Sequence, residues 1–519
     1  MPAAARIAFG APGSLVGNEI ADAIPGATAV TDTEPFALLV LVVAAVGLVA
    51  VLSNRLTDRV AIPSPALFLI GAAVAVKVIP ALHPPQARTV ERVVTVALLC
   101  ILFDGGMHIG RSRFRSAAVP IAVVGVVGTF ATVAAGTVLV HLAFGLDWYV
   151  SILVATAVAP TDPAVVFSVL GRREVAGRSG TILEGESGAN DPVGIALMVS
   201  LIAAGGLSAG AFAPVSGEFL LQMIVGTAVG VVGGRGLLRF MRHVPLPSEG
   251  LYPLRTLASA LGLFGIATLA HGSGFLAVFV AGIMLGDERA PFKREIERFH
   301  ATLASLGEIV AFLVLGLTVD IAEIAQADVW IPGLLIAAAL AFVIRPALVG
   351  VCLIPARLKN NQRNFVLFAG LKGAAPLLLG SFLLAAHVPD AKRLYGIIVV
   401  VVVFSVLVQG SLVPTVARLL HIPMHTVEPE PWGLGVRLRD EPEGIHRLTV
   451  QPGSAADGCT IKDLADLPGQ AWISLVVRDG QALPVRGVTE LLAGDELLIL
   501  ADPDTREEVA APFEARLAP

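Results

Sequence analysis

The 519-residue sequence is short of charge. Lys, Arg, Asp and Glu make up 15% of its residues, whereas an ordinary soluble domain has roughly 25%. Hydrophobic residues make up 55% of the chain, and its mean hydropathy is +0.80. A chain of this length that is mostly apolar is not a set of soluble domains, so the shortage of charge predicts a membrane protein.

Cysteine is scarce as well. Cys100, Cys352 and Cys459 lie far apart in the sequence, and the first two fall within apolar runs. This spacing gives neither a metal site nor a disulfide framework. The chain has no basic tract and a net charge of −5, so we expect no nucleic-acid partner. Nothing in the sequence indicates a cofactor, and we expect none.

Apolar runs of roughly 20 residues, the length that crosses a bilayer, recur along residues 35–420. We predict about thirteen transmembrane helices there, all inside the lipid bilayer. Residues 1–34 lack the apolar segment of a signal peptide and are predicted to be an extracytoplasmic leader. Lys and Arg concentrate in alternate loops, which places the N-terminus outside and the C-terminus in the cytoplasm.

The composition changes after the last apolar run. Residues 421–445 are rich in Pro, Glu and Arg and are predicted to be a linker. Residues 446–505 have the pattern of a small cytoplasmic α+β domain: a strand, a short helix from Thr460, and two strands, the last closed by AGDELLIL. Residues 506–519 form a tail. The predicted fold class is therefore an all-α polytopic membrane protein with a small α+β domain.

Two predicted spans contain helix breakers. The fifth, ATAVAPTDPAVVFSVL, has two prolines around Thr161 and Asp162, and the twelfth, FAGLKGAAPLLLGSF, has two glycines and a proline around a lone Lys372. Carbonyls freed by such breaks bind cations, and paired breaks in a transporter indicate an ion site near the middle of the membrane. Asp162 and Lys372 would offset the half-helix ends. We predict inverted repeats with two broken, crossing helices.

Polar residues open the sixth span, in LEGESGANDPVG. Glu186 and Asn190 share one helix face, and Ser187 and Asp191 share another. A buried Glu186 needs a cationic partner, and Arg345 is the only arginine in the middle of a predicted span, so we predict an ion pair. Asp191 is then left without a permanent partner. Burial favours its neutral form, for which a proton and a metal cation can compete.

Three further acids are less clearly placed. Asp104 lies near the end of the third span, in ILFDGGMHIG, where it faces either the ion path or the membrane interface. Glu184 and Glu308 are expected to line a vestibule or to face water.

At these residues the sequence resembles a known family. The strings PTDPAVVFSVLG, LEGESGANDPVG, FLVLGLTV and GLKGAAPLLL look like those of the bacterial monovalent cation/proton antiporters. The resemblance is greatest to the potassium/proton antiporters of the cell volume regulation protein A type, and it runs from about residue 35 to residue 500. The domain after the linker resembles the TrkA-C module, the C-terminal half of the regulator of potassium conductance (RCK).

The resemblance implies a homodimer in a bacterial plasma membrane, in which a six-helix core slides against a dimerisation domain. It implies a structural ion pair between Glu186 and Arg345, and cation ligands at Thr161, Asp162, Ser187 and Asp191, with Asp104 reaching the site. An Asn at position 190 resembles the electroneutral branch. Lys372 departs from the pattern, because many members have Arg there.

We therefore expect electroneutral exchange of K⁺ or Na⁺ for H⁺ by alternating access, with both ions competing for Asp191, and no enzymatic activity. Two alternatives are a ligand-gated cation channel and an intramembrane aspartyl protease. The protease would need two catalytic aspartates, usually with a Gly-x-Gly-Asp string, which the sequence lacks. At the tail we expect a small-molecule ligand, for which a cyclic dinucleotide such as cyclic di-AMP is one candidate.

Overall fold

The structure is a computed structural model of the chain. It describes residues 63–79, 84–170, 173–175, 177–206, 210, 212–288, 290–426, 444–464, 471–478, 481–502 and 505–514, together with positions 37, 41, 47 and 48. The predicted leader, most of the first predicted span and most of the predicted linker lie outside these residues. The transmembrane unit and the C-terminal unit, which divide near Glu430, are described separately below.

The transmembrane unit is mostly helical, as predicted. Seven of its described helices are long and apolar enough to cross a membrane, and three shorter apolar helices accompany them. The count of about thirteen spans stays a prediction. The helices are α4 (Ser64–Val78), α5 (Ala87–Ala122), α6 (Thr129–Phe144), α7 (Trp148–Val158), α8 (Pro163–Leu170), α9 (Arg178–Ala204), α10 (Phe212–His243), α11 (Leu251–Leu269), α12 (Gly274–Gly286), α13 (Lys293–Gly316), α14 (Ile321–Ile324), α15 (Ala327–Ala339), α16 (Gly350–Cys352), α17 (Asn360–Phe368), α18 (Ala374–Ala385), α19 (Ala391–Phe404) and α20 (Ser411–Leu419).

Three stretches of these spans are π-helical, and one short connection is a 3₁₀ turn. The π-helices are η1 (Val123–Gly128), η2 (Leu340–Val349) and η4 (Ser405–Gly410), and the 3₁₀ turn is η3 (Ile354–Ala356). A π-helical turn inside an α-helix usually marks a functional position. Here η2 carries Arg345 and η4 carries Ser405, and both residues belong to the site described below.

A sharp break at Gly110 joins the third and fourth predicted spans. Gly110 has φ 65° and ψ 169°, so the chain leaves the helix within α5. A side chain could not be placed there, because a Cβ atom at position 110 would lie 2.2 Å from Oδ1 of Asp287. A single glycine therefore makes the turn that the sequence assigned to a loop.

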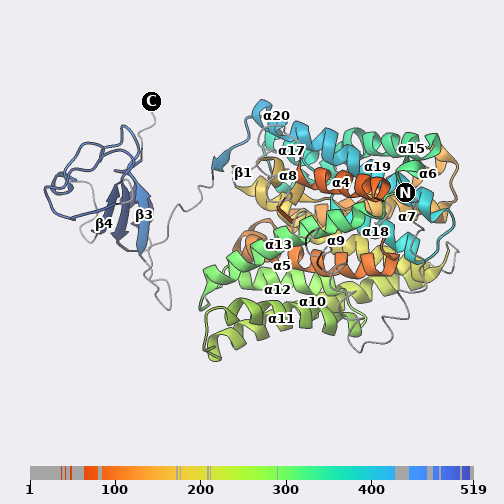
Figure 1. Cartoon of the computed structure of the whole chain (residues 1–519), viewed down its shortest axis with the longest axis horizontal. Helices are drawn as coiled ribbons and strands as arrows, with labels where there is room; N and C mark the ends of the chain where they lie inside the picture. Colours follow the sequence, from red (N-terminus) through yellow and green to blue (C-terminus); the bar gives the residue numbers. More distant parts are fainter. Residues whose placement is uncertain are drawn as a thin grey trace, which may run out of the picture. The chain divides into compact units, whose positions relative to one another are not determined.

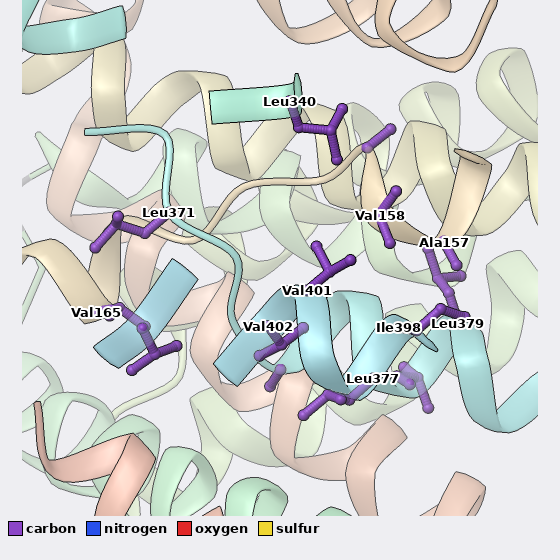
Figure 2. Close-up of a cluster of buried hydrophobic side chains, with 14 of the residues drawn as sticks. Ala157, Val158, Val165, Leu340, Leu371, Leu377, Leu379, Ile398, Val401 and Val402 are labelled. Atoms are coloured by element: carbon purple, nitrogen blue, oxygen red, sulfur yellow. The ribbon is translucent and has the colours of Figure 1, made fainter. Parts of the chain in front are cut away.

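The fifth and twelfth spans are both broken where the sequence predicted. Helix α7 ends at Val158 and α8 begins at Pro163, while α17 ends at Phe368 and α18 begins at Ala374. In Figure 2 the two extended segments between these helices pass one another, surrounded by apolar side chains such as Leu371, Val401 and Leu340. Prolines without an N–H group and glycines explain why the helices stop here.

Contacts divide the membrane helices into two groups. The scaffold group is α4, α5 up to Gly110, and α10 to α13, in which α5 packs against α12 and α13. The core group is α6 to α9 and α15 to α20. The groups meet where α9 contacts α5 and α10, and where α18 contacts α5 and α13. In Figure 1, α10 and α11 lie along one edge of the unit, with α12, α5 and α13 between them and the broken helices.

A short antiparallel ladder joins two distant parts of the core group. Strand β1 (Arg173–Val175), between α8 and α9, pairs with β2 (Met424–Thr426), which follows α20, and Glu174 lies opposite His425. The start of α9 packs closely on β1, because a Cβ atom at Gly180 would lie 2.3 Å from the carbonyl oxygen of Val175. No pattern in the sequence indicates this pairing.

The C-terminal unit is a small α+β domain. Strands β3 (Ile445–Thr449), β4 (Trp472–Arg478), β5 (Gln481–Leu483) and β6 (Glu496–Leu500) form an antiparallel sheet in the order β3-β6-β4-β5. The short helix from Thr460 is a 3₁₀ turn, η5 (Ile461–Asp463). Helix α21 (Arg506–Ala510) follows the sheet. Its Val509, and Phe513 beyond it, are fully buried, so the packed core continues past residue 505.

Candidate functional site

The two broken segments are joined by their backbones. The amide of Asp162 donates a 2.8 Å hydrogen bond to the carbonyl of Leu371. The Asp162 carboxylate accepts a 2.9 Å bond from the amide of Ala164, at the start of α8. It also lies against Gly373, where a Cβ atom would be only 1.8 Å from Oδ2. A carboxylate is thus held where α8 and α18 both begin, which suits the positive ends of the two helices.

Lys372 binds at the C-terminal end of α7. Its side chain is 6% exposed, and Nζ donates a 2.8 Å bond to the carbonyl of Ala159, directly after α7. The Lys372 amide donates to Oγ of Ser405, at 2.9 Å. A buried cation at a helix C-terminus offsets the free carbonyls there. A small cavity borders this lysine and is lined on its polar side by Thr132, Arg345, Lys372, Ser405 and Gln409.

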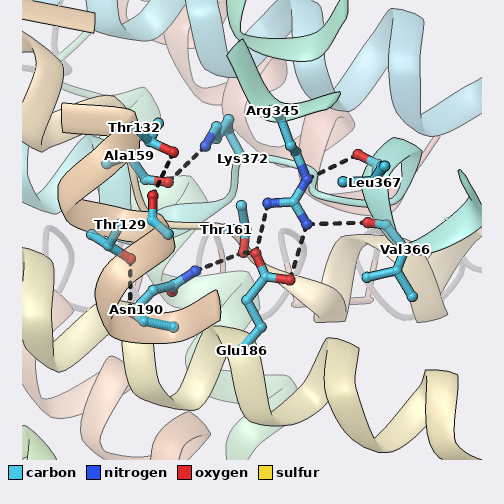
Figure 3. A network of polar contacts seen from close by, with 12 residues as sticks. Thr129, Thr132, Ala159, Thr161, Glu186, Asn190, Arg345, Val366, Leu367 and Lys372 are labelled. Atoms are coloured by element: carbon cyan, nitrogen blue, oxygen red, sulfur yellow. Dashed lines mark hydrogen bonds and ion pairs between the residues drawn. The ribbon is translucent and has the colours of Figure 1, made fainter. Parts of the chain in front are cut away.

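Glu186 and Arg345 lie face to face across the core (Figure 3). Arg345 donates from Nη1 to Oε1 at 2.6 Å and from Nη2 to Oε2 at 3.0 Å. It also donates to the carbonyls of Leu367 and Val366, at 2.9 Å and 3.1 Å. Both side chains are almost wholly buried, at 3% and 7% exposed for Glu186 and Arg345. The arginine thereby fixes α9 to the end of α17.

Thr161 and Asn190 continue this network (Figure 3). Asn190 donates from Nδ2 to Oγ1 of Thr161 at 2.8 Å, and Thr161 Oγ1 lies 3.5 Å from Oε1 of Glu186. Both residues are buried, and Oδ1 of Asn190 accepts no hydrogen bond from the residues described. The threonine of the first broken segment is therefore held between the amide and the acid of α9.

Asp191 is a buried acid next to this network, and none of the hydrogen bonds above involves it. It is 5% exposed, and its Oδ1 is buried with no hydrogen-bond partner in the part of the chain that the structure describes. The charged groups that act on it are Asp162 and Lys372. Ser187 is also buried and lies one helical turn before Asp191 on the same face of α9. Figure 3 shows Glu186 and Asn190 turned toward Thr161 and Arg345.

Asp104 is not brought to this cluster. It is half-buried on α5, and the charges that act on it are those of His108 and Glu297. Glu184 lies in the same region, with its Oε1 3.8 Å from Nε2 of His108.

Glu308 of α13 is a further acid near this cluster. Its Oε1 is buried without a hydrogen-bond partner among the described residues, and the charge of Asp162 acts on it. The signal was present, because Glu308 is the single charged residue of GEIVAFLVLG, a run that is otherwise apolar.

Two discontinuous helices that cross at buried acids, inside a bundle of apolar spans, define an ion transporter. The comparisons with known proteins give the family. The chain belongs to the sodium/hydrogen exchanger family, because that family's transmembrane model matches residues 38–419. The TrkA-C domain model matches residues 445–514.

Named relatives agree with this assignment. The chain is 31% identical to the K⁺/H⁺ antiporter NhaP of Alkalimonas amylolytica over 472 residues, which cover 90% of this chain and 82% of the relative. It is 26% identical to the Na⁺/H⁺ antiporter NhaP of Pseudomonas aeruginosa, over 63% of this chain and 81% of that one. The solved structure of the sodium/proton antiporter MjNhaP1 from Methanocaldococcus jannaschii covers 72% of this chain and 99% of its own, with a TM-score of 0.62 and 20% identity. At that identity the likeness concerns the fold alone.

Proposed function

We propose that this chain exchanges K⁺ or Na⁺ for H⁺, one for one, and that both ions compete for Asp191. A proton leaves the Asp191 carboxyl as a cation binds to it, and the reverse step restores the acid. Oxygens of Thr161, Asp162 and Ser187 complete the cation's surroundings. Asn190 serves by holding Thr161 in place through its 2.8 Å bond.

The unpartnered Oδ1 of Asp191 carries this proposal. In the core group, Asp162, Glu186 and Asp191 face Arg345 and Lys372, so three acids meet two bases. Glu186 is neutralised by Arg345, and Lys372 offsets one of the two aspartates. One negative charge is left over, and a buried uncompensated charge is costly. One proton or one monovalent cation neutralises this charge. Because the proton and the cation carry the same charge, exchanging one for the other is electroneutral.

The two helix groups support alternating access. The acids and bases counted above all belong to the core group, so the core can carry its ion while the scaffold group stays in place. In the native membrane the chain forms a homodimer through the scaffold side, with the N-terminus outside and the TrkA-C domain in the cytoplasm. A small ligand bound between two copies of that domain, such as a cyclic dinucleotide, regulates exchange when it binds one transporter conformation better than the other.

Proteoliposomes with a pH-sensitive dye test the proposal. Addition of K⁺ or Na⁺ should move protons across the membrane in the wild type, and the half-maximal concentrations would rank the two cations. Asp191→Asn should abolish the flux, because Asn cannot exchange a proton for a cation. Asp390→Asn is the matched control: Asp390 is exposed and has φ 56°, a conformation that Asn also adopts. Cation-driven proton flux in Asp191→Asn would rule out this mechanism.

Electroneutrality has its own readout. With Na⁺ as the driving ion and equal K⁺ concentrations on both faces, valinomycin collapses the membrane voltage without creating a K⁺ gradient. One-for-one exchange should run at the same rate with and without valinomycin. A rate that rises with valinomycin would mean that net charge crosses the membrane in each cycle.

A further inference from the structure

We propose that Glu308 is a further acid of the cation path, contributed by the scaffold group. In the position of the core seen here, it faces the ion cluster and supplies a carboxylate oxygen to the bound cation. This inference rests on the proposed exchange at Asp191. It adds a residue from a helix outside the group of five charges that the exchange itself requires.

The buried face of α13 carries Glu308. Ala311, Phe312 and Leu315 are each 0% exposed, and they follow Glu308 at the helical spacing that places all four on one face. That helix contacts α18, the second half of the twelfth span. Glu308 therefore points into the protein and not to the lipid.

One carboxylate oxygen of Glu308 is left without a partner among the described residues. This Oε1 is buried and makes no hydrogen bond to them, although buried polar atoms in proteins are nearly always paired. The group whose charge acts on it is another acid, Asp162, which sits against Gly373 just before α18. Two carboxylates near each other repel when both are ionised, and a cation between them removes that repulsion. On the core side, the unpartnered Oδ1 of Asp191 is a second free oxygen, in a side chain that is only 5% exposed.

Helix packing sets the depth of Glu308 relative to Asp104. A Cβ atom at Gly307 would lie 3.0 Å from the carbonyl of Ala97, and the rings of Phe103 and His300 lie 4.8 Å apart. Helices α5 and α13 are therefore antiparallel, with Glu308 near the level of Ala97. Asp104 is seven residues further along α5, which is about 10 Å at 1.5 Å per residue.

Two scaffold acids thus stand at different depths beside one core site. The site is level with Glu308 here, since Asp162 acts on Glu308, whereas the charges acting on Asp104 are His108 and Glu297. A core that slides toward the end of α5 marked by Arg111 would leave Glu308 and approach Asp104. Glu308 and Asp104 then serve the cation in turn, one on each side of the membrane.

Full-length protein in proteoliposomes, with K⁺ supplied to one face at a time, tests this assignment. Glu308→Gln should raise the KM for K⁺ about tenfold on one face, the scale expected when a charged contact is lost. Asp104→Asn should raise it on the other face. Glu295→Gln removes the same charge from an exposed position on α13 and should leave both KM values unchanged.

The outcomes separate this inference from the proposed function. Absence of proton flux with both K⁺ and Na⁺ in the wild type would refute the exchange itself, and the KM values are compared with the cation that drives exchange in the wild type. Wild-type flux with an unaltered KM in Glu308→Gln would overturn the role of Glu308 and leave the exchange standing. If both mutations acted on the same face, the two-depth arrangement would be wrong. Should Glu308→Gln not fold, Glu308→Asp replaces it. The shorter side chain holds its carboxylate further from the cation, so the KM should again rise. An unchanged KM would overturn the proposal.

Discussion

Arg345 and Glu186 are 159 positions apart in the sequence, yet two nitrogens of the arginine each donate to a separate oxygen of the acid. The same guanidinium also binds the carbonyls of Leu367 and Val366. One side chain thereby connects α9, η2 and α17. Removing it strands a buried carboxylate, whereas neutralising both partners does not.

The first prediction uses this asymmetry. Arg345→Ala should destabilise the protein by about 3–5 kcal/mol, the usual cost of breaking a buried pair. The double change Glu186→Gln with Arg345→Gln should recover part of that loss, because no charge is left unpaired. Melting temperatures of the purified proteins in detergent measure both effects. A double mutant no more stable than Arg345→Ala would contradict the view that the stranded charge causes the damage.

The second prediction concerns Gly373. In Gly373→Ala the new methyl group would start 1.8 Å from Oδ2 of Asp162, so either the carboxylate or the broken segment must move. Exchange should fall at least tenfold, because displacement of a charged ligand costs on the order of 1.4 kcal/mol or more. Gly350→Ala is the control, since its methyl group would lie 3.6 Å from Leu367, an ordinary contact. Equal exchange rates in the two mutants would mean that the position of Asp162 does not matter.

The third prediction concerns the cytoplasmic domain. A chain truncated after Thr426 keeps β2 and its pairing with β1, so it should still exchange cations for protons. Its dependence on pH or on a tail ligand should shift, because the TrkA-C domain is gone. Complete loss of transport in a well-folded truncation would show that the domain belongs to the transport machinery. A chain truncated after Leu420, which lacks β2, is the companion variant and should be less stable.

The fourth prediction lies within that domain. Asp495 is 1% exposed and accepts bonds from Nε and Nη2 of Arg478, both at 2.7 Å, and from the amide of Leu492 at 2.8 Å. Burial acts to raise the pKa of Asp495, but the bonds from Arg478 and Leu492 outweigh it, so the pKa is lowered.

A lowered pKa fixes the direction of the pH effect. The stabilisation from Asp495 should be fully present above the unfolded-state pKa, about 3.9, and should be lost as the pH falls through the lower folded-state value. Asp495→Asn should cost about 1–3 kcal/mol at neutral pH and remove this acid dependence. Hydrogen exchange in β6 of the full-length protein reports the local stability. An Asn variant with the acid sensitivity of the wild type would assign it to another group.

The sequence was sufficient to predict where two helices are broken and which two buried charges form an ion pair. Prolines and glycines around Asp162 and Lys372 specify where helices stop, and a buried Glu186 needs the one arginine that an apolar span contains. The turn at Gly110 was not foreseeable, because it depends on the backbone of α12 and on Asp287, which are distant in sequence. The pairing of β1 with β2 is equally long-range, and each strand has only three residues, too few to show a pattern.

The site shows the same division. Ser187 and Asp191 could be placed on one face of α9 from their spacing alone. Glu308 could not be assigned to the site in this way, because spacing along α13 does not say which helix lies opposite. Its environment arises from the packing of α13 on α5 and α18.

The ladder between β1 and β2 also has a mechanical consequence. Strand β1 directly precedes α9, which carries Asp191. Strand β2 is the last described element of the transmembrane unit before the chain continues toward the TrkA-C domain. A pull exerted by that domain would load this three-residue ladder before it loaded any helix of the bundle. Because α8, α9 and α20 all belong to the core group, the load would fall on the helices that hold Asp191 and not on the scaffold group.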